Sequence, residues 1–298
     1  MFDVVILTDS RYIAPKKKDW YINQVLLEDK ILQNALENKG LKVCRKNWAN
    51  KNFNWRLCKY AIFRSTWDYF EKFDEFFTWI KNTEKKTNFI NSSNIIKWNI
   101  DKNYLKYLEN KTINITPTIF INKKETTLKK LLKLTKWKEA VIKPAISGAA
   151  RHTYRINNKN YAKYESIFQK LIKKESMLFQ EFMNNIPVKG EISLIMIGGK
   201  YTHAVKKNAK SGDFRVQDDH GGTVEIYEAN SVEINFAEKC INKCPFFPIY
   251  ARVDIAYDNK NNPALMELEL IEPELWFRNN EESAIILAEE ILSLISSK

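Results

Sequence analysis

The chain has 298 residues, of which 44% are hydrophobic and 13% aromatic, and it carries a formal net charge of +12. This composition excludes general disorder, and the length provides for one large domain or two to three small ones. No apolar stretch approaches the roughly 20 residues that span a bilayer, and the apolar run at 4–7 lacks the basic flank of a signal peptide. We therefore expect a cytoplasmic protein without membrane association.

The first third of the chain alternates strand and helix signals. Short apolar runs predict strands at 4–7, 41–44, 60–63 and 89–90. Amphipathic spacing predicts helices at about 23–39, ended by Gly40, and at about 72–81. Repeated β-α-β units indicate a parallel sheet whose ligands collect at the carboxyl ends of its strands. The motif RSTWDY at 64–69 follows the third strand and is expected at such an end.

Beyond residue 91 the pattern changes to helices followed by hairpins. Helices are expected at about 102–110, 123–138 and 281–296. Strands are expected at 118–121, 140–143, 192–197, 201–205, 250–256 and 264–270. The turns at 198–199 and 258–263 connect the last four strands as two antiparallel hairpins.

Glycine is rare and unevenly placed. The chain has 8 glycines, and all except Gly40 lie between Gly148 and Gly222, whereas about twenty would be expected at the usual share. Because glycine supplies backbone geometries that other residues avoid, this concentration indicates functional loops.

Neither the cysteines nor the lysines define a site of their own. Cys240 and Cys244 are four residues apart, but no second Cys or His pair accompanies them, so reduced structural thiols are favoured over a metal site. Lysines at 123–138 alternate with leucines at helical spacing, which is typical of a solvated helix face. The alternative is a surface for nucleic acid or an acidic protein, but no aromatic residues interleave with the lysines to form a stacking platform. We expect no nucleic-acid partner.

The strongest candidate site is a set of charged residues on two predicted strands. Arg252 and Asp254 alternate on one strand, and Glu267 and Glu269 alternate on the next, so each pair shares a face. If the two strands form an antiparallel pair, three carboxylates and one guanidinium converge. Such oxygen ligands suit Mg²⁺, which binds carboxylates and substrate phosphates, and suit zinc poorly. A salt-bridged solvent face is the alternative.

Two glycine-bearing loops carry further candidates. Lys143 leaves an apolar strand into a loop of small residues at 144–150, an arrangement that can cradle phosphate although it lacks the P-loop order. The alternative is an ordinary Lys-Pro turn. In the loop GDFR at 212–215, Arg215 is placed to bind a phosphate or a carboxylate bidentately.

A third candidate is an apolar strand that ends in carboxylates. The stretch FQEFM at 179–183 carries Glu181, and Glu191 follows after a short loop. Such a strand can line a nucleotide pocket, with the adenine on backbone groups and the ribose hydroxyls on a carboxylate. The alternative is a plain surface strand end. No serine or cysteine stands in a setting typical of nucleophilic catalysis.

In this order the motifs resemble those of the ATP-grasp superfamily, specifically its glutathione-synthetase-like branch. The matching pieces are DKNYL at 101–105, VIKPAISGAAR at 141–151, LFQEFM at 178–183, GE at 190–191, GDFR at 212–215 with GG at 221–222, and ARVD…MELELIEP from 251 to 273. RSTWDY is similar to the motif of a subgroup that includes D-cycloserine-forming ligases.

The resemblance implies an ATP-grasp fold, α/β (α+β overall), in three parts. These are an N-terminal parallel-sheet domain on the substrate side at 1–95, a small central domain with the phosphate-lid loop at 96–185, and a C-terminal antiparallel-sheet domain with the Mg²⁺ site at 186–298.

The resemblance also implies roles for individual residues. ATP would be bound by Lys102 and Lys143 at the phosphates, Ser147 and Gly148 in the closing loop, Glu181, Phe182 and Met183 at the adenine, and Glu191 at the ribose. Mg²⁺, or Mn²⁺ in its place, would be bound by Asp254, Glu267 and Glu269. Arg252 would stabilise the reaction intermediates, and Arg215 would face phosphate or substrate. Many relatives have Asn where Glu269 stands, and Glu181 and Glu191 lie a few residues further apart than in D-alanine ligases.

The implied activity is ATP- and Mg²⁺-dependent ligation of a carboxylate to an amine through an acyl phosphate, on a small amino-acid-like substrate. The product is an amide or cyclised amide, with ADP and phosphate, and no protein nucleophile is needed. Arg64, Thr66 and Asp68 are the candidate substrate-binding residues; the alternative is a packed strand end with Arg64 paired to Asp68. Other hypotheses are a ligase that modifies an acidic peptide and an ATP-binding regulator without catalysis. Relatives are often dimers, so a homodimer is an option.

Overall fold

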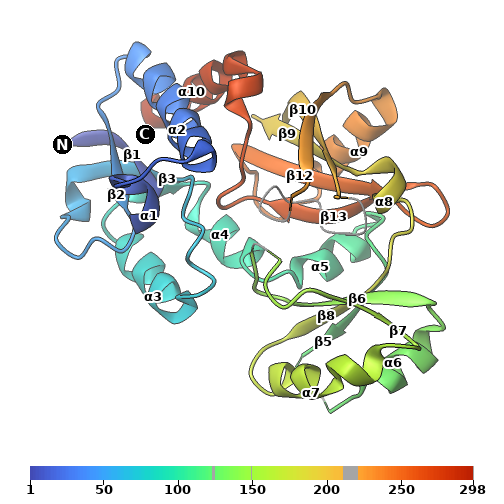
Figure 1. Cartoon of the computed structure of the whole chain (residues 1–298). Helices are drawn as coiled ribbons and strands as arrows, with labels where there is room; N and C mark the ends of the chain where they lie inside the picture. Colours follow the sequence, from blue (N-terminus) through green and yellow to red (C-terminus); the bar gives the residue numbers. More distant parts are fainter. Residues whose placement is uncertain (123–124, 149, 211–220, 298) are drawn as a thin grey trace.

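Three sheets organise the computed structural model, which describes residues 1–122, 125–148, 150–210 and 221–297 (Figure 1). The first sheet is parallel and has the order β2-β1-β3-β4. Its strands are β1 (Phe2–Thr8), β2 (Val43–Asn47), β3 (Cys58–Phe63) and β4 (Asn88–Ile90). The predicted parallel sheet is confirmed.

Helices cover both faces of this first sheet. They are α1 (Ser10–Ile13), α2 (Trp20–Asn38), the short η1 (Trp55–Leu57), α3 (Phe73–Thr83) and α4 (Ser93–Asn99). Alternate residues of β1 explain the arrangement, because Val4 and Ile6 pack against α2 while Val5 and Leu7 pack on the side of α3. Because β1 is buried on both faces, its residues 4–7 are all apolar instead of alternating between apolar and polar.

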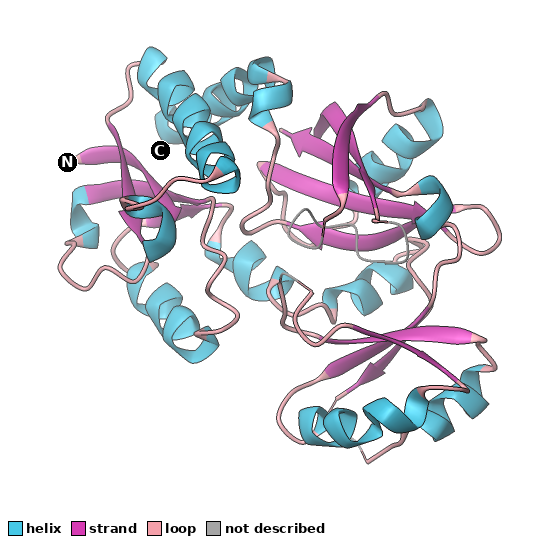
Figure 2. Ribbon diagram, viewed as in Figure 1, coloured by secondary structure: helices cyan, strands magenta, loops and turns pink. Residues whose placement is uncertain are grey.

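The central sheet is antiparallel and has the order β5-β8-β6-β7. Its strands are β5 (Thr118–Ile121), β6 (Glu139–Pro144), β7 (Tyr154–Asn157) and β8 (Met177–Glu181). Helices α6 (Leu128–Thr135) and α7 (Tyr161–Ile172) cover one of its faces (Figure 2). The lysine-rich segment is therefore an amphipathic helix as predicted, but the helix is shorter than 123–138. Residues 123–124 lie outside the described part.

The third sheet is also antiparallel and has the order β11-β10-β9-β12-β13. Its strands are β9 (Glu191–Ile197), β10 (Lys200–Asn208), β11 (Thr223–Tyr227), β12 (Tyr250–Tyr257) and β13 (Pro263–Glu269). Helices near it are α5 (Tyr104–Asn110), α8 (Ile186–Lys189), α9 (Ser231–Asn242), η3 (Phe277–Asn279) and α10 (Glu281–Ser296). Both predicted hairpins are present, β9–β10 and β12–β13.

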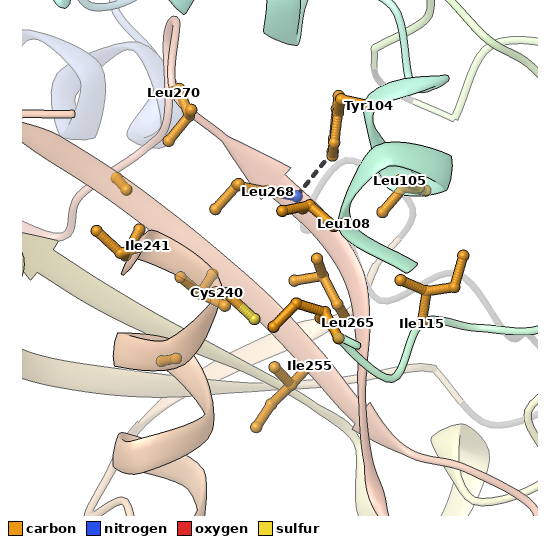
Figure 3. Packing of buried hydrophobic residues seen from close by; sticks show 14 of the residues in the cluster. Tyr104, Leu105, Leu108, Ile115, Cys240, Ile241, Ile255, Leu265, Leu268 and Leu270 are labelled. Atoms are coloured by element: carbon orange, nitrogen blue, oxygen red, sulfur yellow. Dashed lines mark hydrogen bonds between the residues drawn. The ribbon is translucent and has the colours of Figure 1, made fainter. Parts of the chain in front are cut away.

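Helices α5 and α9 share one apolar core with the third sheet. Figure 3 shows Leu108 of α5 and Cys240 of α9 beside Leu265 of β13. The hydroxyl of Tyr104 accepts the backbone N–H of Leu268 at 2.8 Å. These contacts fix the position of β13, which carries two of the predicted metal ligands.

A second core joins the first sheet to the third. Val4 of β1, Leu36 of α2, Ile195 of β9 and Ile291 of α10 all belong to one buried cluster. The last helix therefore packs beside the first sheet, and both chain ends lie there in Figure 1. No helix in the described part of the chain has the length and apolar character needed to cross a membrane.

His203, on β10, provides a stability prediction. Its Nε2 bonds to the carbonyl of Leu275 at 2.9 Å, and burial lowers its pKa to about 4. The pKa of a histidine in the unfolded chain is about 6.5. Between pH 4 and 6.5 the ring of His203 is therefore protonated in the unfolded chain but neutral in the folded chain. Falling pH across this window therefore costs stability, by up to about 3 kcal/mol.

The measurement is urea unfolding at pH 7 and at about pH 4.5 for the wild type and for His203→Gln. We expect the wild type to lose more unfolding free energy than the variant, whose side chain does not titrate. An equal loss in both proteins would contradict the assignment.

Candidate active site

One cavity, of about 220 Å³, lies between the central and third sheets. Of the predicted site residues, twelve line it: Lys102, Lys143, Ser147, Gly148, Glu181, Phe182, Met183, Glu191, Arg252, Asp254, Glu267 and Glu269. They come from parts of the sequence that are more than 160 residues apart, from Lys102 to Glu269. Arg215 lies outside the described residues.

The β12–β13 pairing brings the acidic cluster together as the alternation predicts. Arg252 lies opposite Glu269, and Asp254 lies opposite Glu267. The guanidinium of Arg252 donates to Asp254 at 2.8 and 2.9 Å and also pairs with Glu269. The cluster is not a solvated strand face, because Asp254 is only 2% exposed and all four residues line the cavity.

Lys207, on β10, lines the cavity but is not among the site residues predicted from the sequence. Its ammonium group lies 2.5 Å from the carboxylate of Glu191 and 3.3 Å from that of Asp254, and the residue is 6% exposed. The signal was available, because a hairpin turning at 198–199 brings Lys207 opposite Glu191. Burial opposes the charge on Asp254, but Arg252 and Lys207 outweigh it and hold the pKa of Asp254 below its usual range.

The two predicted phosphate-binding lysines both lie near Glu267 of the acidic cluster. Lys102 donates to the carbonyl of Ser147 at 2.7 Å and lies 3.0 Å from the carboxylate of Glu267. Lys143 is the next-to-last residue of β6, and burial lowers its pKa although Glu267 acts in the opposite direction. Lys102 thus connects Ser147 to the acidic cluster.

At the other end, the cavity is bordered by the segment that leaves β8. Phe182 lies under the guanidinium of Arg155, with 3.8 Å between the guanidinium carbon and the ring centre. Gln180 was not predicted, yet it lines the cavity, is 2% exposed and donates to the hydroxyl of Thr118 at 2.9 Å. Gly190, just before Glu191, has a φ of 75°, and a Cβ there would lie 2.7 Å from the carbonyl oxygen of Lys207.

The RSTWDY motif contacts the cavity only through its last residue. Tyr69 lines the cavity, whereas Arg64, Thr66 and Asp68 do not. Asp68 accepts hydrogen bonds from the indole of Trp48 at 2.7 Å and from Lys72 at 2.6 Å. The alternative pairing of Arg64 with Asp68 is therefore wrong. A substrate-binding role for Arg64, Thr66 and Asp68 stays a prediction.

The carboxylate oxygens of Asp254, Glu267 and Glu269 are the kind of ligand that a hard divalent cation prefers. In this structure, however, these carboxylates form ion pairs with Arg252 and Lys102. Six carboxylates and four cationic side chains are among the described residues that line the cavity. Burial and neighbouring carboxylates raise the pKa of Glu269 well above its usual value, which a divalent cation would offset. No group of three or more His, Cys, Asp and Glu side chains in the described ranges is arranged to hold a metal. Coordination would require Arg252 and Lys102 to give up their carboxylates.

Comparison with known protein families identifies the family to which the chain belongs. A family model described as the RimK-like ATP-grasp domain matches residues 101–295. The chain belongs to the RimK-like ATP-grasp family. This ATP-grasp ligase also matches, at residues 4–91, a model described as the N-terminal domain of D-cycloserine synthetase DcsG.

Individual relatives of the ATP-grasp ligase cover most of its length. The cycloserine biosynthesis protein DcsG of Streptomyces lavendulae is 23% identical over an alignment of 265 residues that covers 84% of this chain and 87% of that protein. The crystal structure of D-cycloserine synthetase DcsG matches with a TM-score of 0.87 and 19% identity, covering 98% of this chain and 99% of that one.

Two more distant structures share the fold. D-alanine–D-alanine ligase from Bacillus anthracis has a TM-score of 0.64 and 16% identity, over 100% of this chain and 98% of that one. The ATP-grasp ligase PsnB, complexed with precursor peptide PsnA2 and AMPPNP, has a TM-score of 0.63 and 13% identity, over 99% and 97%. The predicted ATP-grasp fold is confirmed, and enzymes of this fold use ATP and Mg²⁺.

Proposed function

We propose that the protein joins a small amino-acid-like carboxylate to an amine, with ATP and Mg²⁺, through an acyl phosphate. The observation that carries the proposal is the convergence of Asp254, Glu267 and Glu269 with Arg252 and the lysines in one cavity. Catalysis by such a set is positioning plus charge neutralisation, which is what phosphoryl transfer requires.

Each part of the cavity has a place in this reaction. The segment Glu181–Met183 would hold the adenine and Glu191 the ribose, while Lys102 and Lys143 would bind phosphate oxygens. Mg²⁺, when bound, neutralises the phosphate charge that develops as the substrate carboxylate attacks. Arg252 would stabilise the negative charge on the acyl phosphate and on the tetrahedral species formed when the amine attacks.

Ser147 and Gly148 begin the loop that would supply the closure such a reaction needs. Lys102 binds the backbone carbonyl of Ser147, and a Cβ at Gly148 would lie 2.6 Å from the ring of Phe70, so Gly148 is closely packed against the segment that follows RSTWDY. A closed loop would protect an acyl phosphate from water.

The test is a screen of carboxylate and amine pairs for ADP release, with mass spectrometry of the products. ADP release that depends on both partners, together with an amide product, would support the proposal. ATP binding without ADP formation across the whole panel would instead support a regulator without catalysis.

A ligase acting on an acidic peptide is the second candidate. Helices α6 and α7, with the two residues that follow α7, expose Lys129, Lys130, Lys133, Lys170, Lys173 and Lys174 on the outside of the central sheet, and such a surface attracts acidic chains. The structural neighbour PsnB is described with a precursor peptide. Salt-sensitive binding of an oligoglutamate peptide would favour this candidate, and turnover of free amino acids would oppose it.

A further inference from the structure

Among the six carboxylates that line the cavity, Glu272 and Glu181 form no ion pair with a Lys or Arg of the described residues, and Glu272 is the one that lies beside Glu267 of the acidic cluster. Glu191 pairs with Lys207, Asp254 and Glu269 pair with Arg252, and Glu267 pairs with Lys102. Within the described residues, no Lys or Arg forms an ion pair with Glu272, although its side chain lines the same cavity. A carboxylate that is removed from water without a counter-ion is costly, so a bound molecule that supplies a positive charge would be stabilised there.

The RSTWDY motif holds this carboxylate in position through three contacts. The indole of Trp67 donates to the backbone carbonyl of Glu272 at 2.9 Å, and Arg64 donates to the carbonyl of Pro273 at 2.8 Å. Tyr69 also lines the cavity, and its hydroxyl and the carboxylate of Glu272 are near enough that each shifts the pKa of the other. The motif therefore fixes both the backbone and the side chain of one residue from the other end of the sequence.

The position of Glu272 in the cavity indicates which positively charged group of a substrate it would bind. It follows Glu269 by three residues, and Lys102 and Glu267 are the nearby charges that act on it, so it stands beside the place assigned to the reacting phosphate. In an α-amino acid the ammonium group is two bonds from the carboxyl carbon. A carboxylate substrate placed for attack on the phosphate would therefore bring an α-ammonium group near Glu272, whereas an amine on a long side chain would extend away.

We propose that Glu272 binds the α-ammonium group of the carboxylate substrate, with RSTWDY as its positioning element; this rests on the proposed ligase function. Glu272 then determines specificity for α-amino acids over simple carboxylic acids. Tyr69 acts through Glu272 by directing its carboxylate into the cavity.

The test compares amino acids with their deaminated counterparts, namely D- and L-serine with 3-hydroxypropionate, and D- and L-alanine with propionate. Affinity is measured calorimetrically in the presence of Mg²⁺ and a non-hydrolysable ATP analogue. We expect the wild type to bind at least one amino acid about tenfold or more tightly than its counterpart, since a charge-assisted hydrogen bond is lost without the ammonium group. Glu272→Gln should bind both members of that pair equally, and Tyr69→Phe should retain part of the preference.

Glu274→Gln is the matched control, because Glu274 lies in the same segment but bonds Arg278 outside the cavity; it should keep the full preference. Glu272→Gln removes an uncompensated charge and keeps the shape, so it should fold and bind the ATP analogue like the wild type. A preference that survives in Glu272→Gln, or a wild type that has none, overturns the inference.

Failure of the ligase proposal has a separate signature, read from ADP release with hydroxylamine as the acceptor for the same carboxylates. ADP release without an ammonium preference overturns the role of Glu272 alone. An ammonium preference that depends on Glu272, without ADP release, overturns the ligase proposal and leaves the ammonium contact standing.

Discussion

Glu267→Gln is expected to lower ADP formation by about a hundredfold or more, with the carboxylate and amine pair that the screen identifies. Glu267 lies opposite Asp254 and binds Lys102 at 3.0 Å, so it contributes to both the proposed metal site and the placement of a phosphate-binding lysine. The amide keeps the size of the side chain but removes the charge. Steady-state ADP release measures the effect, and circular dichroism checks that the variant is folded.

The control for this variant is Glu225→Gln, on β11. Glu225 is an exposed carboxylate that lies 3.8 Å from the ammonium group of Lys206, and its loss should leave ADP formation unchanged. If Glu267→Gln kept full turnover, the assignment of Glu267 as a metal ligand would be wrong.

Lys207→Met is expected to lower the free energy of unfolding by about 3–5 kcal/mol, because it leaves buried negative charge without a partner. Lys207 is 6% exposed, and it is the ion-pair partner of Glu191 at 2.5 Å and a second partner of Asp254. Methionine retains the apolar stem, so the loss reports the charge rather than a cavity. Urea unfolding at neutral pH gives the value.

The neighbouring Lys206 offers a matched comparison on the same strand. Its side chain points to the other face and lies 3.8 Å from the exposed Glu225, so Lys206→Met should change the unfolding free energy by less than about 1 kcal/mol. Equal effects of the two substitutions would show that the pairing of Lys207 with the buried carboxylates does not stabilise the fold.

Local signals predict the parallel first sheet and the acidic cluster, whereas the ATP-grasp fold and the role of Lys102 follow from the resemblance of the motifs to a known family. Alternation along two strands suffices to place Arg252 opposite Glu269 and Asp254 opposite Glu267, once the turn between the strands is recognised. Element ends are less accurate: α2 begins at Trp20 rather than near residue 23, because the Asp19 side chain accepts the N–H of Ile22 and caps the helix there.

What the sequence could not provide are contacts between segments that are distant along the chain. Trp67 and Glu272 are 205 residues apart, and no local pattern connects them. The absence of a cationic partner for Glu272 is likewise visible only after the described cations of the cavity have been placed. An ion pair between Arg64 and Asp68 was one alternative because the two residues are close in the motif. In the structure, Asp68 instead accepts hydrogen bonds from Trp48 and Lys72.

The core shared by the first strand and the last helix has a consequence for how the protein is made. Val4 and Leu36 are synthesised early, but Ile195 and Ile291, which cover them, leave the ribosome much later. At translation rates of about 5–20 residues per second, part of the apolar surface of the first sheet stays exposed for many seconds, until Ile195 and Ile291 have been synthesised. We therefore expect the amino-terminal third to complete its folding only after the segment at 281–296 has been synthesised, with apolar surface exposed to aggregation or to chaperones until then.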